Sequence, residues 1–247
     1  CRTRVIANIH GPEVIDGRGN ICFTSINLPR IAFEAKGNVD KAFQILEKRL
    51  DLVARQLIHR LVLTGKRPKT DFPFLFGENL YIDSEKLKDT DSILPSLKHG
   101  SLTFGFVGLD DFVRILTGYG MHENPDAYKL GYDVVEFIKK FSDDCIEKYK
   151  YNFAVIGSPA ESASGRFAMI DKQLFGEHLN INDKGFYTNS HHMAVDADIS
   201  VTEKLEKEGP FHKLCNGGHI CHVFLDAAPN HNTKAIKQIV ENALVNE

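Results

Sequence analysis

Residues 101–109, Ser-Leu-Thr-Phe-Gly-Phe-Val-Gly-Leu, decide the fold class of this chain. The run is mostly apolar, and its glycines would let a neighbouring backbone come close. It is therefore predicted to be a buried strand. Strands that read as continuous apolar runs occur mainly in parallel sheets whose faces are covered by helices.

Helical and extended patterns alternate on both sides of this strand. Upstream, residues 20–27 alternate weakly and predict a strand that Pro29 terminates. Residues 39–63 carry apolar side chains at spacings of three and four, which predicts a long amphipathic helix. Downstream, three further elements are expected: a helix from Asp110 or Asp111 to Leu116, a helix from Pro125 to about Tyr149, and a strand over 152–156.

The remaining pattern continues this order. A short helix is expected within residues 83–87, and another after the turn at 157–166, through Phe167 and Ile170. The later segments predict a strand at 186–190, a helix at 201–207, a strand at 219–226 and a final helix at 233–245. Strands that alternate with helices imply parallel βα units, so one α/β domain is expected over residues 1–247.

Composition limits the class of protein. The chain has 43% hydrophobic and 26% charged residues and a formal net charge of −3, which is typical of a soluble globular protein and argues against broad nucleic-acid binding. No apolar run is long enough for a membrane span. Five cysteines, an odd number, favour reduced thiols and a cytoplasmic location. Because the chain begins on Cys1 rather than methionine, we expect a piece of a longer polypeptide.

The turn between the strand at 152–156 and the next helix is a candidate anion site. Residues 157–166 read Gly-Ser-Pro-Ala-Glu-Ser-Ala-Ser-Gly-Arg. Small residues before a helix N-terminus offer backbone N–H groups and hydroxyls that suit a phosphate. The same pattern is also typical of ordinary helix capping, with Ser158 and Glu161 as a capping box. The residues alone leave both interpretations open.

The cysteine and histidine side chains are candidate metal ligands, and Cys1 is a candidate nucleophile. Cys215, His219, Cys221 and His222 have poor spacing for zinc, because alternate residues of a strand point to opposite faces. No metal site is therefore expected in this chain. Arg2 and Arg4 would favour the thiolate of Cys1, which makes a reactive cysteine plausible, but its position alone favours a disordered terminal cysteine.

Several separated segments together resemble the anaerobic, glycyl-radical ribonucleotide reductases. They occur in that family's order along nearly the whole chain: Cys1-Arg2-Thr3, Asn27-Leu28-Pro29-Arg30, residues 100–109, Ser158 to Ser162 with Arg166-Phe167 and Asp171-Lys172, residues 187–191, and Gly217-Gly218-His219-Ile220.

The resemblance implies a ten-stranded α/β barrel with a finger loop through its centre. Residues 1–30 would form the finger loop and returning strand, and residues 31–247 the second half-barrel. Cys1 would form a thiyl radical, and Asn27 would hydrogen-bond the sugar hydroxyls or formate. The substrate phosphates would lie near a turn made of Ser158, Pro159, Ala160, Glu161, Ser162, Ala163 and Ser164.

The activity implied is reduction of ribonucleoside triphosphates to deoxyribonucleoside triphosphates without oxygen, with formate as reductant. A glycyl radical, installed by an activase that uses S-adenosylmethionine and an iron–sulfur cluster, and a structural zinc are expected in a C-terminal part beyond this chain. The full-length protein would be a homodimer, and this chain alone would be inactive.

Two alternatives stay open: a glycyl-radical enzyme with a non-nucleotide substrate, and a non-catalytic nucleotide-binding or assembly module. The former would have no use for the phosphate turn.

Overall fold

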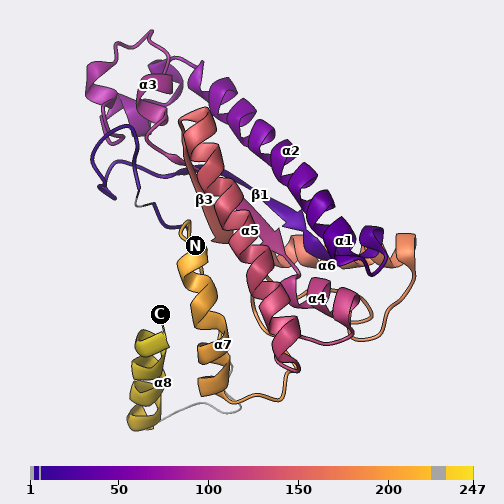
Figure 1. The fold of residues 1–247 in the computed structure, drawn as a ribbon. Helices are drawn as coiled ribbons and strands as arrows, with labels where there is room; N and C mark the ends of the chain where they lie inside the picture. The colour runs from indigo at the N-terminus through magenta and orange to yellow at the C-terminus, as the bar shows by residue number, and fades with distance from the viewer. Residues whose placement is uncertain (1–2, 6, 224–231, 247) are drawn as a thin grey trace.

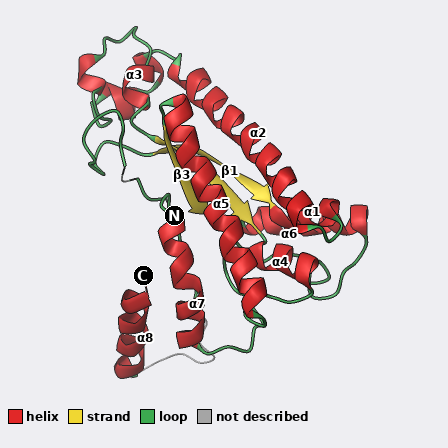
Figure 2. Ribbon diagram, in the orientation of Figure 1, coloured by secondary structure: helices red, strands yellow, loops and turns green. Residues whose placement is uncertain are grey.

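The computed structural model describes residues 3–5, 7–223 and 232–246 (Figures 1 and 2). At its centre is a parallel sheet of three strands in the order β1-β2-β3. They are β1 (Asn20–Asn27), β2 (Ser101–Val107) and β3 (Asn152–Gly157). The register pairs Ser25 with Gly105, and Gly105 with Ile156. The prediction of parallel βα units is confirmed.

Helices connect the strands and follow the sheet. The helices before β3 are α1 (Leu28–Ala35), α2 (Val39–Gly65), α3 (Leu94–Leu97), α4 (Leu109–Thr117) and α5 (Pro125–Tyr149). After β3 come α6 (Glu161–Phe175), α7 (Val201–Leu214) and α8 (Thr233–Asn246). Three short helical turns, Lys69–Asp71, Pro73–Gly77 and Ser84–Lys86, lie between α2 and α3. The last of these lies in the segment predicted as a short helix.

Both long crossover helices, α2 and α5, cover the same face of the sheet (Figure 1). Right-handed crossovers between strands added in one direction must all lie on one face. The core is built there: Phe104 stacks with Phe153 at 5.6 Å between ring centroids and meets Phe141 of α5 at 5.9 Å. Cys22 of β1 approaches the Leu57 carbonyl of α2.

The opposite face of the sheet carries mainly small and polar side chains, among them Ser25, Thr103 and Ala154, together with Phe23 and Ile156. Alternation along each strand places these residues away from α2 and α5. Helix α6 covers the carboxyl end of this face, where Ala168 packs with Val107 and Tyr187. The sheet therefore presents a polar surface that leads toward its carboxyl edge.

Two predicted strands are not found as predicted. Residues 186–190 form no strand, because the carbonyls of Thr188 and Ser190 accept hydrogen bonds from Gly108 and Leu109 at the β2–α4 turn. Residues 219–223 form none either, and 224–226 lie outside the described residues. The neighbour of β3 is instead the short segment at Gly217 and Gly218, which bonds to Val155 and Gly157.

Helix α7 is longer than predicted and runs through Pro210 to Leu214. Burial explains the extension. Glu208 accepts a hydrogen bond from the Met193 backbone (2.9 Å), and Phe211 packs on Tyr128 at 5.7 Å. These tertiary contacts outweigh the local cost of an interior proline.

Two further properties concern the helices and the cysteines. None of the described helices combines the length and the apolar character that crossing a bilayer requires. Cys22, Cys145, Cys215 and Cys221 are all free thiols.

Candidate active site

Asn27 lies where β1 ends and α1 begins. Its Oδ1 accepts a hydrogen bond from the Arg30 backbone N–H (3.2 Å), so the side chain caps the helix. Its Nδ2 donates to Oδ2 of Asp171 on α6 (2.9 Å). Asn27 therefore ties the carboxyl end of β1 to α6, and both polar ends of its amide are engaged.

Asp171 joins three side chains at this edge of the sheet, although it was not predicted from the sequence to be a site residue. Its carboxylate is fully buried and accepts hydrogen bonds from Asn27, from the Arg30 guanidinium and from the Tyr187 hydroxyl (2.9 Å). Burial, together with the neighbouring Asp171 charge, raises the pKa of Tyr187. A sequence pattern could have indicated that Asp171 is buried, because Ser164, Ala168 and Asp171 recur at helical spacing on the buried side of α6.

The predicted phosphate turn follows β3 directly. Ser158 is buried, and its Oγ lies 2.6 Å from Oγ of Ser25 on β1. The intervening strand permits this contact only because residue 105 is glycine. A Cβ there would lie 2.2 Å from the Ser158 hydroxyl and 2.9 Å from that of Ser25. The hydroxyls of β1 and of the turn thus meet across the polar face of the sheet.

The rest of the turn leads into the N-terminus of α6. Pro159 is half-buried, Ala160 is buried, Ala163 is half-buried, and Glu161 and Ser162 are exposed. Ser164 is buried and its hydroxyl donates to the Glu161 carbonyl (2.8 Å). Ala160 occupies the N-cap position, and no side chain accepts a capping bond at this end. The ends of α1, α2, α5 and α7, in contrast, are capped by Asn27, Asn38, Asn124 and Ser200.

The N-terminus of this 15-residue helix is electropositive, and its N-cap residue supplies no side-chain cap. The neighbouring Asn189 accepts a bond from the Ala160 N–H (3.4 Å) and donates to the Glu161 carboxylate (3.2 Å). Because Ala160 rather than Ser158 occupies the N-cap position, the start of α6 does not match the capping box of Ser158 and Glu161. Ser158 faces Ser25, and Glu161 faces Asn189.

A groove of about 510 Å³ lies at the same edge, between β1, α1, α2 and α6. Three arginines contribute to its lining. Arg30 is paired with Asp171 and Arg49 with Glu34, whereas Arg166 makes no ion pair among the described residues. The other lining residues are Ser25, Ile26, Asn27, Ile31, Leu52, Val53, Phe167 and Ile170. The groove therefore carries an excess of positive charge beside the middle of α6.

The whole chain, residues 1–247, matches the family model described as anaerobic ribonucleoside-triphosphate reductase. The chain belongs to this family. It is 33% identical over 248 residues to the anaerobic ribonucleoside-triphosphate reductase of Escherichia coli K12, covering 97% of this chain and 34% of that protein. The phage T4 enzyme of the same name is 29% identical over 239 residues, covering 94% of this chain and 37% of that protein. The chain thus spans about a third of the length of the curated relatives it matches.

Solved structures agree on the fold. The anaerobic ribonucleotide reductase of Thermotoga maritima with glycerol in the active site superposes with a TM-score of 0.72 at 22% identity. The match covers 98% of this chain and 38% of that one. A Thermotoga maritima structure in complex with dATP and CTP matches with a TM-score of 0.66 and 22% identity, covering 96% of this chain and 37% of that chain. The resemblance inferred from the separated motifs is confirmed.

The family resemblance predicts Cys1, Asn27 and the 158–164 turn as site residues. In the structure, Asn27 and the 158–164 turn lie at one edge of the sheet. Cys1 lies outside the described residues. The loop that follows it, from Thr3 to Gly19, runs to the opposite edge, where the strands begin (Figure 1).

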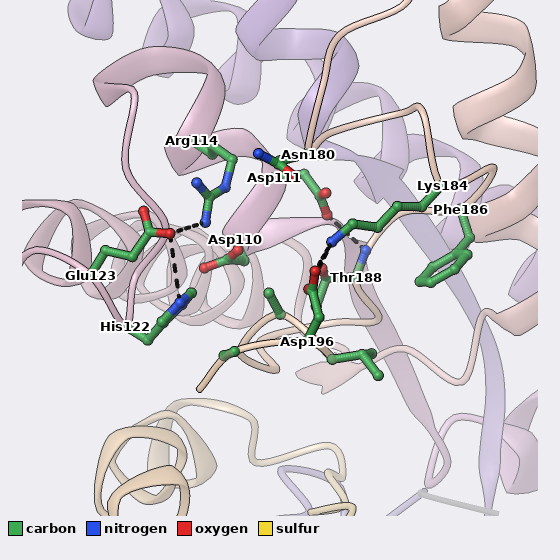
Figure 3. Close-up of a pocket in the computed structure, with 13 residues that line it drawn as sticks. Asp110, Asp111, Arg114, His122, Glu123, Asn180, Lys184, Phe186, Thr188 and Asp196 are labelled. Atoms are coloured by element: carbon green, nitrogen blue, oxygen red, sulfur yellow. Dashed lines mark hydrogen bonds and ion pairs between the residues drawn. The ribbon is translucent and has the colours of Figure 1, made fainter. Parts of the chain in front are cut away.

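A second pocket of about 260 Å³ lies beside α4 (Figure 3). Asp110 and Asp111 are buried in it, and burial raises the pKa of Asp111 to about 7. Its two cations are already paired, Lys184 with Asp196 and Arg114 with Glu123. With four carboxylates against two cations, this pocket is electrostatically unfavourable for a polyanion.

The cysteine and histidine residues near the end of the chain do not form a metal centre in the described part of the chain, where no three potential ligands converge. Burial raises the pKa of the Cys215 thiol to about 12, which disfavours the thiolate that zinc requires. Cys221 lies 3.4 Å from Oε2 of Glu208, and His192 Nδ1 lies 3.1 Å from the same oxygen. Glu208 therefore organises this cluster through hydrogen bonds.

Proposed function

We propose that this chain is the second half of the catalytic barrel of an anaerobic ribonucleoside-triphosphate reductase, with the finger loop in residues 1–19. The family membership supports this assignment, and so does the arrangement of the sheet. Helices α2 and α5 cover one face, as in the outer layer of a barrel, and the other face is polar. A ten-stranded barrel would close when the rest of the full-length polypeptide supplies the missing strands.

The observation that carries the proposal is the N-terminus of α6, which follows the carboxyl end of β3 at the same edge of the sheet as Asn27 and the arginine-lined groove. Phosphates of a ribonucleoside triphosphate would accept hydrogen bonds from backbone N–H groups at the N-terminus of α6. The sugar would then lie over the polar face of the sheet. Asn27 would hydrogen-bond a sugar hydroxyl or formate by exchanging its bond to Asp171 for one to the ligand.

The chemistry follows from a thiyl radical at Cys1. The sulfur takes the hydrogen atom from the 3′ carbon, which forms an S–H bond and breaks a C–H bond. The 2′ hydroxyl leaves as water after protonation. Formate then supplies two electrons and leaves as carbon dioxide, and the thiol returns its hydrogen atom to the 3′ carbon. Overall, one ribonucleotide, one formate and one proton give one deoxyribonucleotide, one carbon dioxide and one water.

The proposal also includes components of the reductase that would lie outside these 247 residues. We assign to the remainder of the full-length protein the glycyl radical that generates the thiyl radical, the structural zinc, and the docking surface of the radical-installing activase. A homodimer of the full-length protein is part of the same proposal. The residues of this chain are left with three tasks: holding Cys1, orienting the sugar and binding the phosphates.

The test is a Cys1→Ser substitution in the full-length reductase. Reduction of all four ribonucleoside triphosphates should be abolished, because an O–H bond is too strong to yield the corresponding radical. Binding of the same nucleotides, measured by calorimetry, should stay within about twofold of the wild-type value because the phosphate turn is untouched. Turnover by the variant would contradict the radical role. Absence of triphosphate binding by the wild type would instead favour a non-nucleotide substrate.

A further inference from the structure

The loop before β1 is fixed to the sheet by buried amide side chains. Asn8 is 8% exposed although it lies in a mostly exposed loop, and it meets His99 (1%) and Asn152 (4%) where β2 and β3 begin. Three polar side chains from three separate segments are thus buried together. Buried polar groups of this kind are expected to be fully hydrogen-bonded.

Asn152, the first residue of β3, bonds the loop directly. Its Oδ1 accepts a hydrogen bond from the Ile9 N–H (2.9 Å), and its Nδ2 donates to Oδ1 of Asn8 (3.2 Å). The same Nδ2 lies 3.1 Å from the His99 carbonyl. A single side chain therefore links the loop, the start of β2 and the start of β3.

Asn8 completes the network and fixes the state of His99. Its Nδ2 donates to the Pro12 carbonyl (3.0 Å) and lies 3.1 Å from Nδ1 of His99. Because an amide nitrogen is only a donor, Nδ1 must accept, and the His99 proton must be on Nε2, which faces Asp83 at 3.3 Å. Burial lowers the pKa of His99, with Asp83 acting in the opposite direction, which agrees with a neutral ring.

A second attachment lies four residues closer to Cys1. The Arg4 N–H donates to the Gly217 carbonyl (2.8 Å), and the Gly217 N–H donates to the Val155 carbonyl of β3 (2.7 Å). A Cβ on residue 217 would lie 2.9 Å from Cγ2 of Thr103, which places this glycine over the polar face of the sheet. The loop therefore leaves the strand starts at Asn8 and reaches the polar face at Arg4.

We infer that Asn152 and Asn8 are positioning residues that hold the loop between Cys1 and β1 against the starts of β2 and β3. The inference rests on the proposed function of Cys1. Hydrogen transfer needs sulfur and carbon in contact, and a displacement of about 1 Å costs about 100-fold in rate. Loss of the anchor at Asn8 would loosen the loop. It would therefore lower the rate of hydrogen transfer without affecting the phosphate turn at the opposite edge.

The experiment compares Asn8→Ala with Asn124→Ala in the full-length reductase. Asn124 caps α5 through bonds to Asp126 and Ala127, far from the loop, so both variants lose one asparagine and a comparable amount of stability. For Asn8→Ala, kcat should fall about 10- to 100-fold while KM and nucleotide affinity change less than about twofold. Asn124→Ala should keep the wild-type kcat. Asn152→Ala is the second variant and should behave like Asn8→Ala.

Two results would overturn the inference: a kcat for Asn8→Ala within twofold of wild type, or an equal loss in Asn124→Ala at matched melting temperature. Trypsin cleavage after Arg4 and Arg18 provides a readout independent of catalysis. Faster cleavage in Asn8→Ala than in Asn124→Ala is expected, and equal rates would contradict the anchor. If the wild type reduces no ribonucleotide, the proposed function fails, and the proteolysis result still decides whether the loop is anchored.

Discussion

Asn27 shows how a single residue can be committed to structure and still be a candidate for catalysis. Its Oδ1 caps α1 and its Nδ2 binds Asp171, so removing the side chain must cost stability before any effect on chemistry is considered. Loss of an N-cap costs about 1 kcal/mol, and leaving the buried Asp171 short of a donor adds about 1–3 kcal/mol. A drop in activity after Asn27→Ala alone would be ambiguous.

The serine substitution separates the two roles. In Asn27→Ser the hydroxyl can still cap α1, but the amide is gone. If the amide takes part in reduction, Asn27→Ser should lose rate as Asn27→Ala does, with triphosphate affinity little changed, while unfolding measured by denaturant should show Asn27→Ser as the more stable variant. Wild-type reduction rates in Asn27→Ser would assign Asn27 a structural role alone.

At the scale of secondary-structure elements, α6 combines two features that suit a polyanion. Its N-terminus is uncapped, and Arg166 follows Ser162 by four residues, on the same side of the helix. Side chains of a helix tilt toward its N-terminus, so the Arg166 guanidinium can extend back toward the turn. Because Arg166 has no carboxylate partner among the described residues, its charge is available to the outer phosphates of a triphosphate.

An Arg166→Gln substitution in the full-length reductase tests this role. We expect KM for ribonucleoside triphosphates to rise about tenfold, the effect of losing one charge-assisted bond of about 1.4 kcal/mol, with kcat unchanged. KM for the corresponding diphosphates should change less, since they lack the outermost phosphate. Lys172→Gln, on the same helix but paired with Glu177, is the matched control. Equal effects on both nucleotide classes would place Arg166 away from the outer phosphates.

The elements also show which features local sequence could predict. Residues 101–109 predicted β2 because a buried strand is apolar along its whole length. The apolar spacing of three and four in residues 39–63 predicted α2 because one face of this helix is buried. Helix α1 has only eight residues, so it offered too few turns for a periodic pattern. The strand predicted at 186–190 was wrong because its carbonyls accept hydrogen bonds from the β2–α4 turn rather than from a neighbouring strand. Local sequence did not reveal the site role of Asp171, since its partners come from β1, α1 and a distant loop.

At the scale of the whole molecule, the sheet has one edge that the described strands leave unpaired. β1 pairs only with β2 among them, and Phe23 on this strand is 39% exposed. An open strand edge with an exposed aromatic side chain is a template for pairing with another chain. In the proposed barrel, strands from elsewhere in the full-length protein would cover this edge. The 247-residue chain on its own would have to expose it or cover it with a second copy.

We therefore expect the isolated 247-residue chain to self-associate as its concentration is raised, which sedimentation velocity would detect. Phe23→Lys places a charge on the open edge and should shift the chain toward monomer, because a buried unpaired ammonium opposes strand pairing. Leu63→Lys provides the matched control, since Leu63 is also exposed (61%) but lies on α2 rather than on the sheet edge. Association that responds equally to both substitutions would indicate general apolar contact. A monomer at every concentration would mean that the β1 edge is protected within this chain, and would remove the unpaired edge as support for a barrel completed by other strands.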